Sequence, residues 1–173
     1  VGGVITGFAT ADNNFYTVNL TTGAFSLVGP ISGSQVYLGL TAALTPIAPT
    51  LPTAAGTSSN VTTAGGTTQT VSVTYTDNTA VNVSTINTGD ITVTGPGGFT
   101  ATPTFVSVDN PANGTPRIAT YSFTPPGGSW NTADNGTYNI VMQADQVADT
   151  SGIFVAAGTI GTFTVNIASP QTF

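Results

Sequence analysis

The sequence lacks most of the side chains from which proteins build reactive sites. It contains no Cys and no His, and its single basic residue is Arg117. Glu is absent as well, so every acidic residue is Asp. General bases, activated nucleophiles and tight metal sites are usually assembled from the missing residue types. The composition therefore argues against an enzyme, and we expect no catalytic residue and no cofactor.

Charge is also scarce, because only 5% of the residues are charged and the net charge is −6. With one Arg there is no basic patch to bind the phosphate backbone of a nucleic acid or an anionic membrane surface. No apolar run approaches the roughly 18 residues that a membrane-spanning helix requires. We expect neither nucleic-acid binding nor membrane insertion.

The beginning of the chain carries no targeting signal. It starts at Val1 without a basic region or a cleavable apolar region, so we expect a processed or partial product. The absence of Cys excludes disulfides. Abundant Thr, Asn and Gly with almost no basic residue are typical of exported bacterial surface proteins, and we expect an extracellular or cell-surface location.

The residues that are present favour strands and turns. Val, Thr, Ile, Phe and Tyr are frequent, and 21 Gly and 11 Pro supply turns. This predicts an all-β protein in three segments. A small antiparallel β-unit is expected over residues 1–44, a Pro-rich linker over 45–53, and a β-sandwich over 54–173.

The first unit reads as four short strands joined by turns, over Val4–Ala9, Phe15–Leu20, Ala24–Val28 and Gln35–Ala42. The segment "FYTVNLTTGAFSLVG" at residues 15–29 resembles the blade repeat of secreted bacterial β-propeller-like proteins. The motif occurs once, and a lone blade exposes apolar faces and edges. We therefore expect this unit to pack on the second domain, on another subunit, or within a larger parent protein.

The second domain shows apolar residues at every other position, which is the strand period. The apolar residues of these runs are Val71, Val73, Tyr75, Ile91, Val93, Phe105, Val106, Val108, Ala119, Tyr121, Phe123, Tyr138, Ile140, Met142, Phe163, Val165 and Ile167. Turn residues separate the runs. Six or seven short strands in this arrangement predict a Greek-key β-sandwich.

One local pattern resembles the tyrosine corner of immunoglobulin-like domains: Asp134, Gly136 and Tyr138, followed by alternating apolar residues. Ile140 stands where antibody domains have Cys. The quoted segments "VSVTYTDNTAVNVSTINTGDITVTGPGGF", "ADNGTYNI" and "ADQVADTSGIFVAAGTIGTFTV" resemble Ig-like modules of large extracellular bacterial proteins. The resemblance implies the fold and the setting but no molecular activity.

Most of the acidic residues lie in or next to predicted loops: Asp77, Asp90, Asp109, Asp134, Asp145 and Asp149. Loop carboxylates can bind Ca²⁺, as the surface domains that this sequence resembles often do. The expected ligands are Asp77, Asp145 and Asp149. The alternative is that these acids stabilise turns through hydrogen bonds to nearby backbone amides.

Three further side chains carry expectations. Trp130 and Phe99 lie beside Gly- and Pro-rich turns, where aromatic rings either stack on carbohydrate or plug the end of a sandwich. Arg117, the lone cation, is placed to pair with Asp109 across a hairpin.

Both ends of the chain are uncharged and β-prone, over Val1–Ala9 and Gly158–Ile167. Such segments can add to the open sheet edge of a neighbour, and the chain has no Lys to protect an edge. The expected subunit-interface residues are Val1, Val4, Ile5, Phe8, Phe163, Val165 and Ile167. The alternative is that both ends complete the chain's own sheets.

These features favour a structural subunit of an extracellular bacterial filament or surface layer. It would assemble with copies of itself through β-strand complementation. The alternative is an adhesin-type Ig-like spacer or ligand-binding module of a larger cell-surface protein.

Overall fold

The structure is a computed structural model, and it describes residues 6–11, 14–20, 23–30 and 50–169. The chain divides into two compact units, Val1–Ile47 and Ala48–Phe173. Within the described ranges, helical segments are limited to short 3-10 turns, and none is long and apolar enough to cross a membrane.

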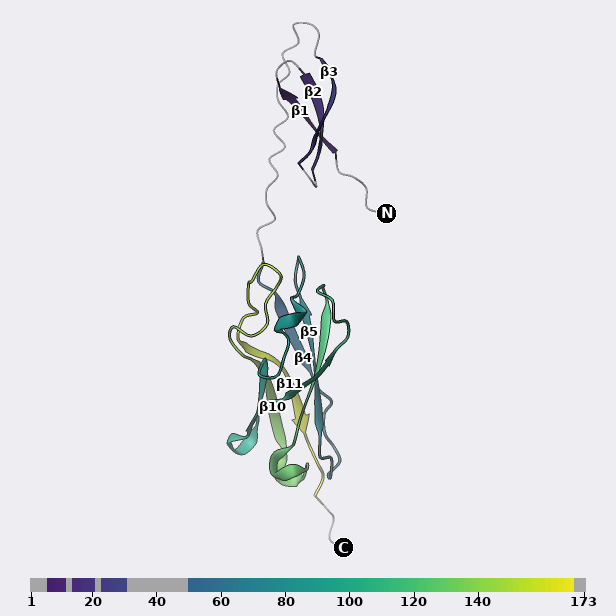
Figure 1. Ribbon diagram of the computed structural model, residues 1–173. Helices are drawn as coiled ribbons and strands as arrows, with labels where there is room; N and C mark the ends of the chain where they lie inside the picture. The colour runs from purple at the N-terminus through teal and green to yellow at the C-terminus, as the bar shows by residue number, and fades with distance from the viewer. Residues whose placement is uncertain (1–5, 12–13, 21–22, 31–49, 170–173) are drawn as a thin grey trace. The chain divides into compact units, whose positions relative to one another are not determined.

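The first unit is an antiparallel sheet in the order β1-β2-β3 (Figure 1). Its strands are β1 (Thr6–Ala11), β2 (Asn14–Asn19) and β3 (Phe25–Pro30). They match three of the expected strands within about two residues. The fourth expected strand, Gln35–Ala42, lies outside the described residues.

The second unit contains two four-stranded antiparallel sheets. The first sheet has the order β4-β5-β9-β8, with β4 Thr53–Thr57, β5 Gln69–Thr76, β9 Arg117–Phe123 and β8 Thr104–Val108. The second sheet has the order β11-β10-β6-β7, with β11 Gly158–Val165, β10 Gly136–Met142, β6 Ile91–Thr94 and β7 Thr100–Ala101. The 3-10 turns are η1 Val83–Thr85, η2 Pro96–Gly98, η3 Pro126–Gly128 and η4 Thr132–Asp134. The expected all-β fold with a β-sandwich is confirmed.

Alternation along the strands builds the core between the two sheets. Val71, Val73 and Tyr75 of β5 are fully buried, whereas the residues between them are not. β10 repeats the pattern with Tyr138 and Ile140. Because successive side chains of a strand point to opposite sides, each sheet presents one apolar face to the other.

The segment after β4 crosses from the first sheet to the second. Val61 forms a parallel bridge with Val165 of β11, and its amide donates to the carbonyl oxygen of Thr164 at 2.9 Å. The first and last strands of the sandwich therefore run in the same direction. As a result, the chain enters this unit at one end and leaves at the opposite end (Figure 1).

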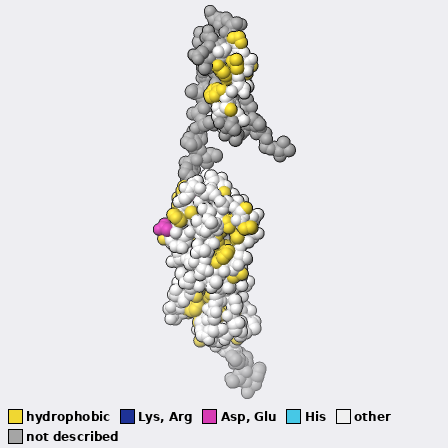
Figure 2. All heavy atoms as spheres, in the orientation of Figure 1, with side chains coloured by type: hydrophobic (Ala, Val, Ile, Leu, Met, Phe, Trp, Pro, Cys, Tyr) yellow, Lys and Arg dark blue, Asp and Glu magenta, His cyan; other side chains and the backbone are white. Residues whose placement is uncertain are grey.

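The outward faces of the two sheets are rich in hydroxyl groups, and the side of the sandwich seen in Figure 2 shows very little charged surface. On the first sheet the outward residues include Thr57, Thr70, Ser72, Thr74, Thr104, Thr120 and Ser122. The charged residues of this unit lie in loops, in the η4 turn, or at the start of β9: Asp77, Asp90, Asp109, Arg117, Asp134, Asp145 and Asp149. Neither face therefore opposes the close approach of another uncharged surface by charge repulsion.

Candidate interaction surface

Among the described residues of the first unit, the most exposed large apolar side chains all lie on β3. Phe25 is 65% exposed, Leu27 61% and Val28 59%. We call these three residues the β3 surface. Exposed apolar groups gathered on a single short strand are a feature of interaction sites, whereas scattered ones need no explanation.

Strand pairing shows how this surface is organised. Phe25 lies opposite Val18 of β2, and Leu27 lies opposite Tyr16. The rings of Tyr16 and Phe25 meet edge to face, with centroids 6.2 Å apart. The pairing shifts by one residue at Val28, which forms a bulge in β3. One face of the sheet therefore carries a contiguous set of apolar side chains from two strands.

β3 is also an outer strand of its sheet among the described residues. Proteins usually protect such edges with charge, above all with Lys. The chain has no Lys, and Asp12 is the single charged residue within positions 1–47. Exposed apolar side chains thus lie on a strand that carries no charged residue.

The expected interface residues fall into two groups. Val1, Val4 and Ile5 lie outside the described residues, and Phe8 lies in β1 opposite Thr17. Phe163, Val165 and Ile167 are instead buried in the core of the sandwich, with exposures of 2%, 2% and 6%. β11 is part of the second sheet of the sandwich. The C-terminal segment therefore completes a sheet of its own chain, which is the alternative to an interface role.

The three expected calcium ligands, Asp77, Asp145 and Asp149, are not gathered into one group of acids. Asp149 is buried, and its Oδ1 accepts hydrogen bonds from the amides of Ser151 and Ile153, both at 2.8 Å. Asp77 Oδ2 accepts from the amide of Thr79 at 2.8 Å and from the hydroxyl of the same residue. The Thr79 hydroxyl is the main cause that lowers the pKa of Asp77. Each acid therefore stabilises its own turn.

Asp145 is exposed and has a positive φ of 56°. The described residues contain no group of three acids that could hold a metal ion together. The turn chemistry offered as the alternative accounts for the hydrogen bonds that Asp77 and Asp149 make.

Asp134 and Tyr138, two residues of the pattern that resembles a tyrosine corner, contact each other. The Tyr138 hydroxyl donates to the carbonyl oxygen of Asp134 at 3.0 Å, and this bond is buried. The Asp134 carboxylate caps η4 by accepting from the amide of Asn131 at 2.8 Å. Burial raises the pKa of Tyr138 to about 12, so this hydroxyl stays protonated at neutral pH.

Of the two aromatic residues beside turns, Trp130 belongs to the core and Phe99 is partly buried against it. Trp130 is 2% exposed, and its indole N–H donates to Oε1 of Gln69 at 3.1 Å. Phe99 packs edge to face on Tyr138, with ring centroids 5.8 Å apart. The packing role is therefore the one that Trp130 fulfils, and its ring is not a platform for carbohydrate.

Arg117 binds a loop instead of an acid. Its guanidinium donates to three backbone carbonyl oxygens, those of Ala112 at 2.8 Å, Asn113 at 3.1 Å and Pro116 at 2.6 Å. Asp109 accepts from the amide of Ile118 at 2.9 Å. In place of the expected ion pair, Arg117 and Asp109 each bond to backbone groups.

No sequence pattern identifies Asp90 as the most deeply buried acid of the described residues. Asp90 is fully buried, and its Oδ2 accepts from the Tyr121 hydroxyl at 2.7 Å and from the amide of Asn87 at 2.8 Å. The alternation of β9 places Tyr121 inside the sandwich, but no local pattern identifies the acid that it meets.

Comparison with known proteins gives little. No family model matches the chain. No curated protein matches it. Among solved structures, the chain is similar to the N-terminal part of the bacterial S-layer protein SbsC, with 20% identity and a TM-score of 0.37. That match covers 68% of this chain and 24% of the S-layer structure.

Proposed function

We propose that the chain is a structural subunit of an extracellular bacterial filament or surface layer, and that copies associate by β-strand complementation at the first unit. The β3 surface supports this proposal, because Phe25 and Leu27 are more than half exposed on an outer strand. A strand from another copy that pairs with β3 supplies main-chain hydrogen bonds and covers these side chains.

The energetic reason is the small size of the β1-β2-β3 sheet. The three short strands that the structure describes there bury little apolar surface by themselves, and such a sheet is marginal in water. Full burial of a large apolar side chain contributes about 1.5–3 kcal/mol. Association costs free energy because each copy loses translational and rotational freedom. Covering Phe25 and Leu27 offsets part of this cost.

The sandwich suits a load-bearing role. Its strand orders, β4-β5-β9-β8 and β11-β10-β6-β7, follow the order of immunoglobulin-like sheets, and the buried Tyr138–Asp134 contact is of the tyrosine-corner type. These features support an Ig-like module. Uncharged Thr- and Ser-rich faces keep it hydrated without strong repulsion between neighbours.

The alternative function is an adhesin-type spacer within a longer surface protein. One observation favours it: the chain enters and leaves the sandwich at opposite ends (Figure 1). Modules with this geometry can follow one another in line. In that case the β3 surface packs on a neighbouring part of the same polypeptide.

Sedimentation velocity distinguishes the two functions. A subunit should show oligomers whose share grows with protein concentration, and the double substitution Phe25→Thr and Leu27→Thr should return it to monomer. Val106→Thr is the matched control, because Val106 is 57% exposed but lies in the sandwich. Monomers at every concentration would refute the subunit and leave the spacer.

A further inference from the structure

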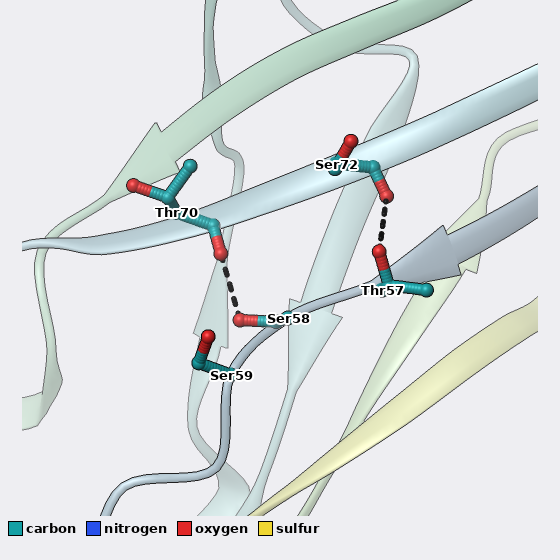
Figure 3. Close-up of a pocket in the computed structure, with 5 residues that line it drawn as sticks. All are labelled: Thr57, Ser58, Ser59, Thr70 and Ser72. Carbon is teal, nitrogen blue, oxygen red and sulfur yellow. Dashed lines mark hydrogen bonds between the residues drawn. The ribbon is translucent and has the colours of Figure 1, made fainter.

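A groove opens in the first sheet where β4 separates from β5. Pairing of these strands ends at Thr57 and Ser72, after which the chain turns away toward β11. The groove has a volume of about 330 Å³ and is lined by Thr57, Ser58, Ser59, Thr70 and Ser72 (Figure 3). Every lining residue carries a hydroxyl group.

The wall of the groove is held in place by hydrogen bonds. Ser58 Oγ donates to the carbonyl oxygen of Thr70 at 2.7 Å and accepts from Nε2 of Gln69 at 2.7 Å. Nε2 of Gln69 also donates to the carbonyl oxygen of Ser59 at 2.9 Å. Gln69 is 7% exposed and is fixed from behind by the indole of Trp130. The groove is therefore preformed, which lowers the entropic cost of binding.

Other hydroxyls of the groove remain available. Those of Ser59, Thr70 and Ser72 make no hydrogen bond to any described part of the chain. A hydroxyl both donates and accepts, so this lining matches a ligand that itself carries several hydroxyls. The lining contains no carboxylate that could bind a cation and no basic side chain that could bind an anion. The volume lies at the lower end of the usual range for small-molecule sites, about 300–1,000 Å³.

We infer that this groove binds a neutral sugar residue, as a subsite for one ring of a polysaccharide chain. The site is separate from the β3 surface and from the two aromatic residues that the sequence pointed to. Hydrogen bonds to sugar replace hydrogen bonds to water, so each one contributes little net affinity. The dissociation constant of a single groove is accordingly millimolar.

Assembly makes such a weak site useful. Copies joined as proposed above present many grooves to one polysaccharide, and rebinding at neighbouring grooves raises the overall affinity. Only this increase in overall affinity rests on the proposed function. The groove itself belongs to a single copy.

The test uses the ¹⁵N-labelled full chain carrying Phe25→Thr and Leu27→Thr, so that association at β3 does not interfere. Maltose, cellobiose, mannobiose and chitobiose are titrated in turn, and amide shifts are followed. At least one sugar should give saturable shifts centred on residues 57–59 and 70–72. Thr70→Val, which removes one hydroxyl at constant shape, should weaken binding about two- to tenfold. Thr120→Val, on the same face but outside the groove, should leave binding unchanged.

Three results would overturn the inference. The first is the absence of saturable shifts up to roughly 100 mM of every sugar, where a millimolar site is nearly full. The second is a set of shifts that maps away from the groove. The third is equal binding by the Thr70→Val variant and its parent. None of these results bears on association at β3, so the two proposals fail separately.

Discussion

Tyr121 donates its hydroxyl hydrogen to Oδ2 of Asp90 at 2.7 Å inside the sandwich. The Tyr75 hydroxyl lies 3.0 Å from that of Tyr121. Because Tyr121 has a single hydrogen and gives it to the acid, Tyr75 is the donor in the second bond. The other carboxyl oxygen of Asp90, Oδ1, is buried without a partner. Burial raises the pKa of Asp90 and also those of both tyrosines.

The raised pKa of Asp90 predicts a pH-dependent stability. The unfolded chain has an Asp pKa of about 3.9, so the folded state binds this proton more tightly. The contribution of Asp90 to the free energy of unfolding is therefore greatest below about pH 4, and it is lost as the pH rises through the folded pKa. Urea unfolding from pH 3 to 7 should show that Asp90→Asn removes this loss.

The difference in the free energy of unfolding between the wild-type protein and Asp90→Asn gives the contribution of Asp90 alone. The lowered pKa of Asp77 acts in the opposite direction, but it is present in both proteins and cancels. If the wild-type protein and Asp90→Asn show parallel stability curves over the whole range, Asp90 does not titrate differently on folding.

The two tyrosines should differ in what they contribute. Tyr121→Phe deprives Asp90 of a hydrogen bond and leaves the Tyr75 hydroxyl without its acceptor, so we expect a loss of about 1–3 kcal/mol. Tyr75→Phe removes only the outer donor and should cost about 0.5–1 kcal/mol. Chemical denaturation measures both. Equal losses would show that the chain of hydrogen bonds does not run toward Asp90.

Gly161 of β11 permits a close approach between the two sheets. A Cβ atom at this position would lie 1.9 Å from the carbonyl oxygen of Gly56 in β4. Gly161→Ala must therefore push these strands apart, and we expect a loss of about 1–3 kcal/mol. Gly66→Ala is the control, since its Cβ would lie 3.4 Å from Trp130. Similar melting temperatures for both variants would contradict the close packing.

Arg117 should act through hydrogen bonds to carbonyls and not through an ion pair. An ammonium group cannot span the three oxygens that the guanidinium reaches, so Arg117→Lys should cost about 1 kcal/mol. The cost should persist in about 1 M salt, where exposed ion pairs are screened. A cost that disappears in salt would restore the pairing with Asp109.

The strands of the sandwich and their buried positions could be predicted largely because apolar and polar residues alternate along them. Runs such as Val71, Val73 and Tyr75 place every second residue in the core, and the structure follows them. β4 was missed, because "TAAGT" has small residues and begins at Thr53, inside the expected linker. Its place depends on pairing with β5 and on the contact with Gly161, and a single strand's sequence shows neither.

The candidate sites were less predictable for a related reason. The Tyr138–Asp134 contact lies within a pattern that the sequence shows, because its partners are four residues apart. Asp90 and Tyr121 are 31 positions apart and meet only after the sheets pack. The β3 surface depends on which face of a short sheet stays uncovered, and the groove depends on where two strands separate. No local sequence pattern predicts which face stays uncovered or where the strands separate.

Negative-stain electron microscopy of the full chain and of Leu27→Lys tests the central claim most directly. The Lys introduces, on the β3 surface, the charge that natural sheet edges use to prevent pairing. Our account predicts filaments or sheets from the wild-type chain and separate particles from the variant. Separate particles from both proteins, or ordered assemblies from both, would contradict association through β3.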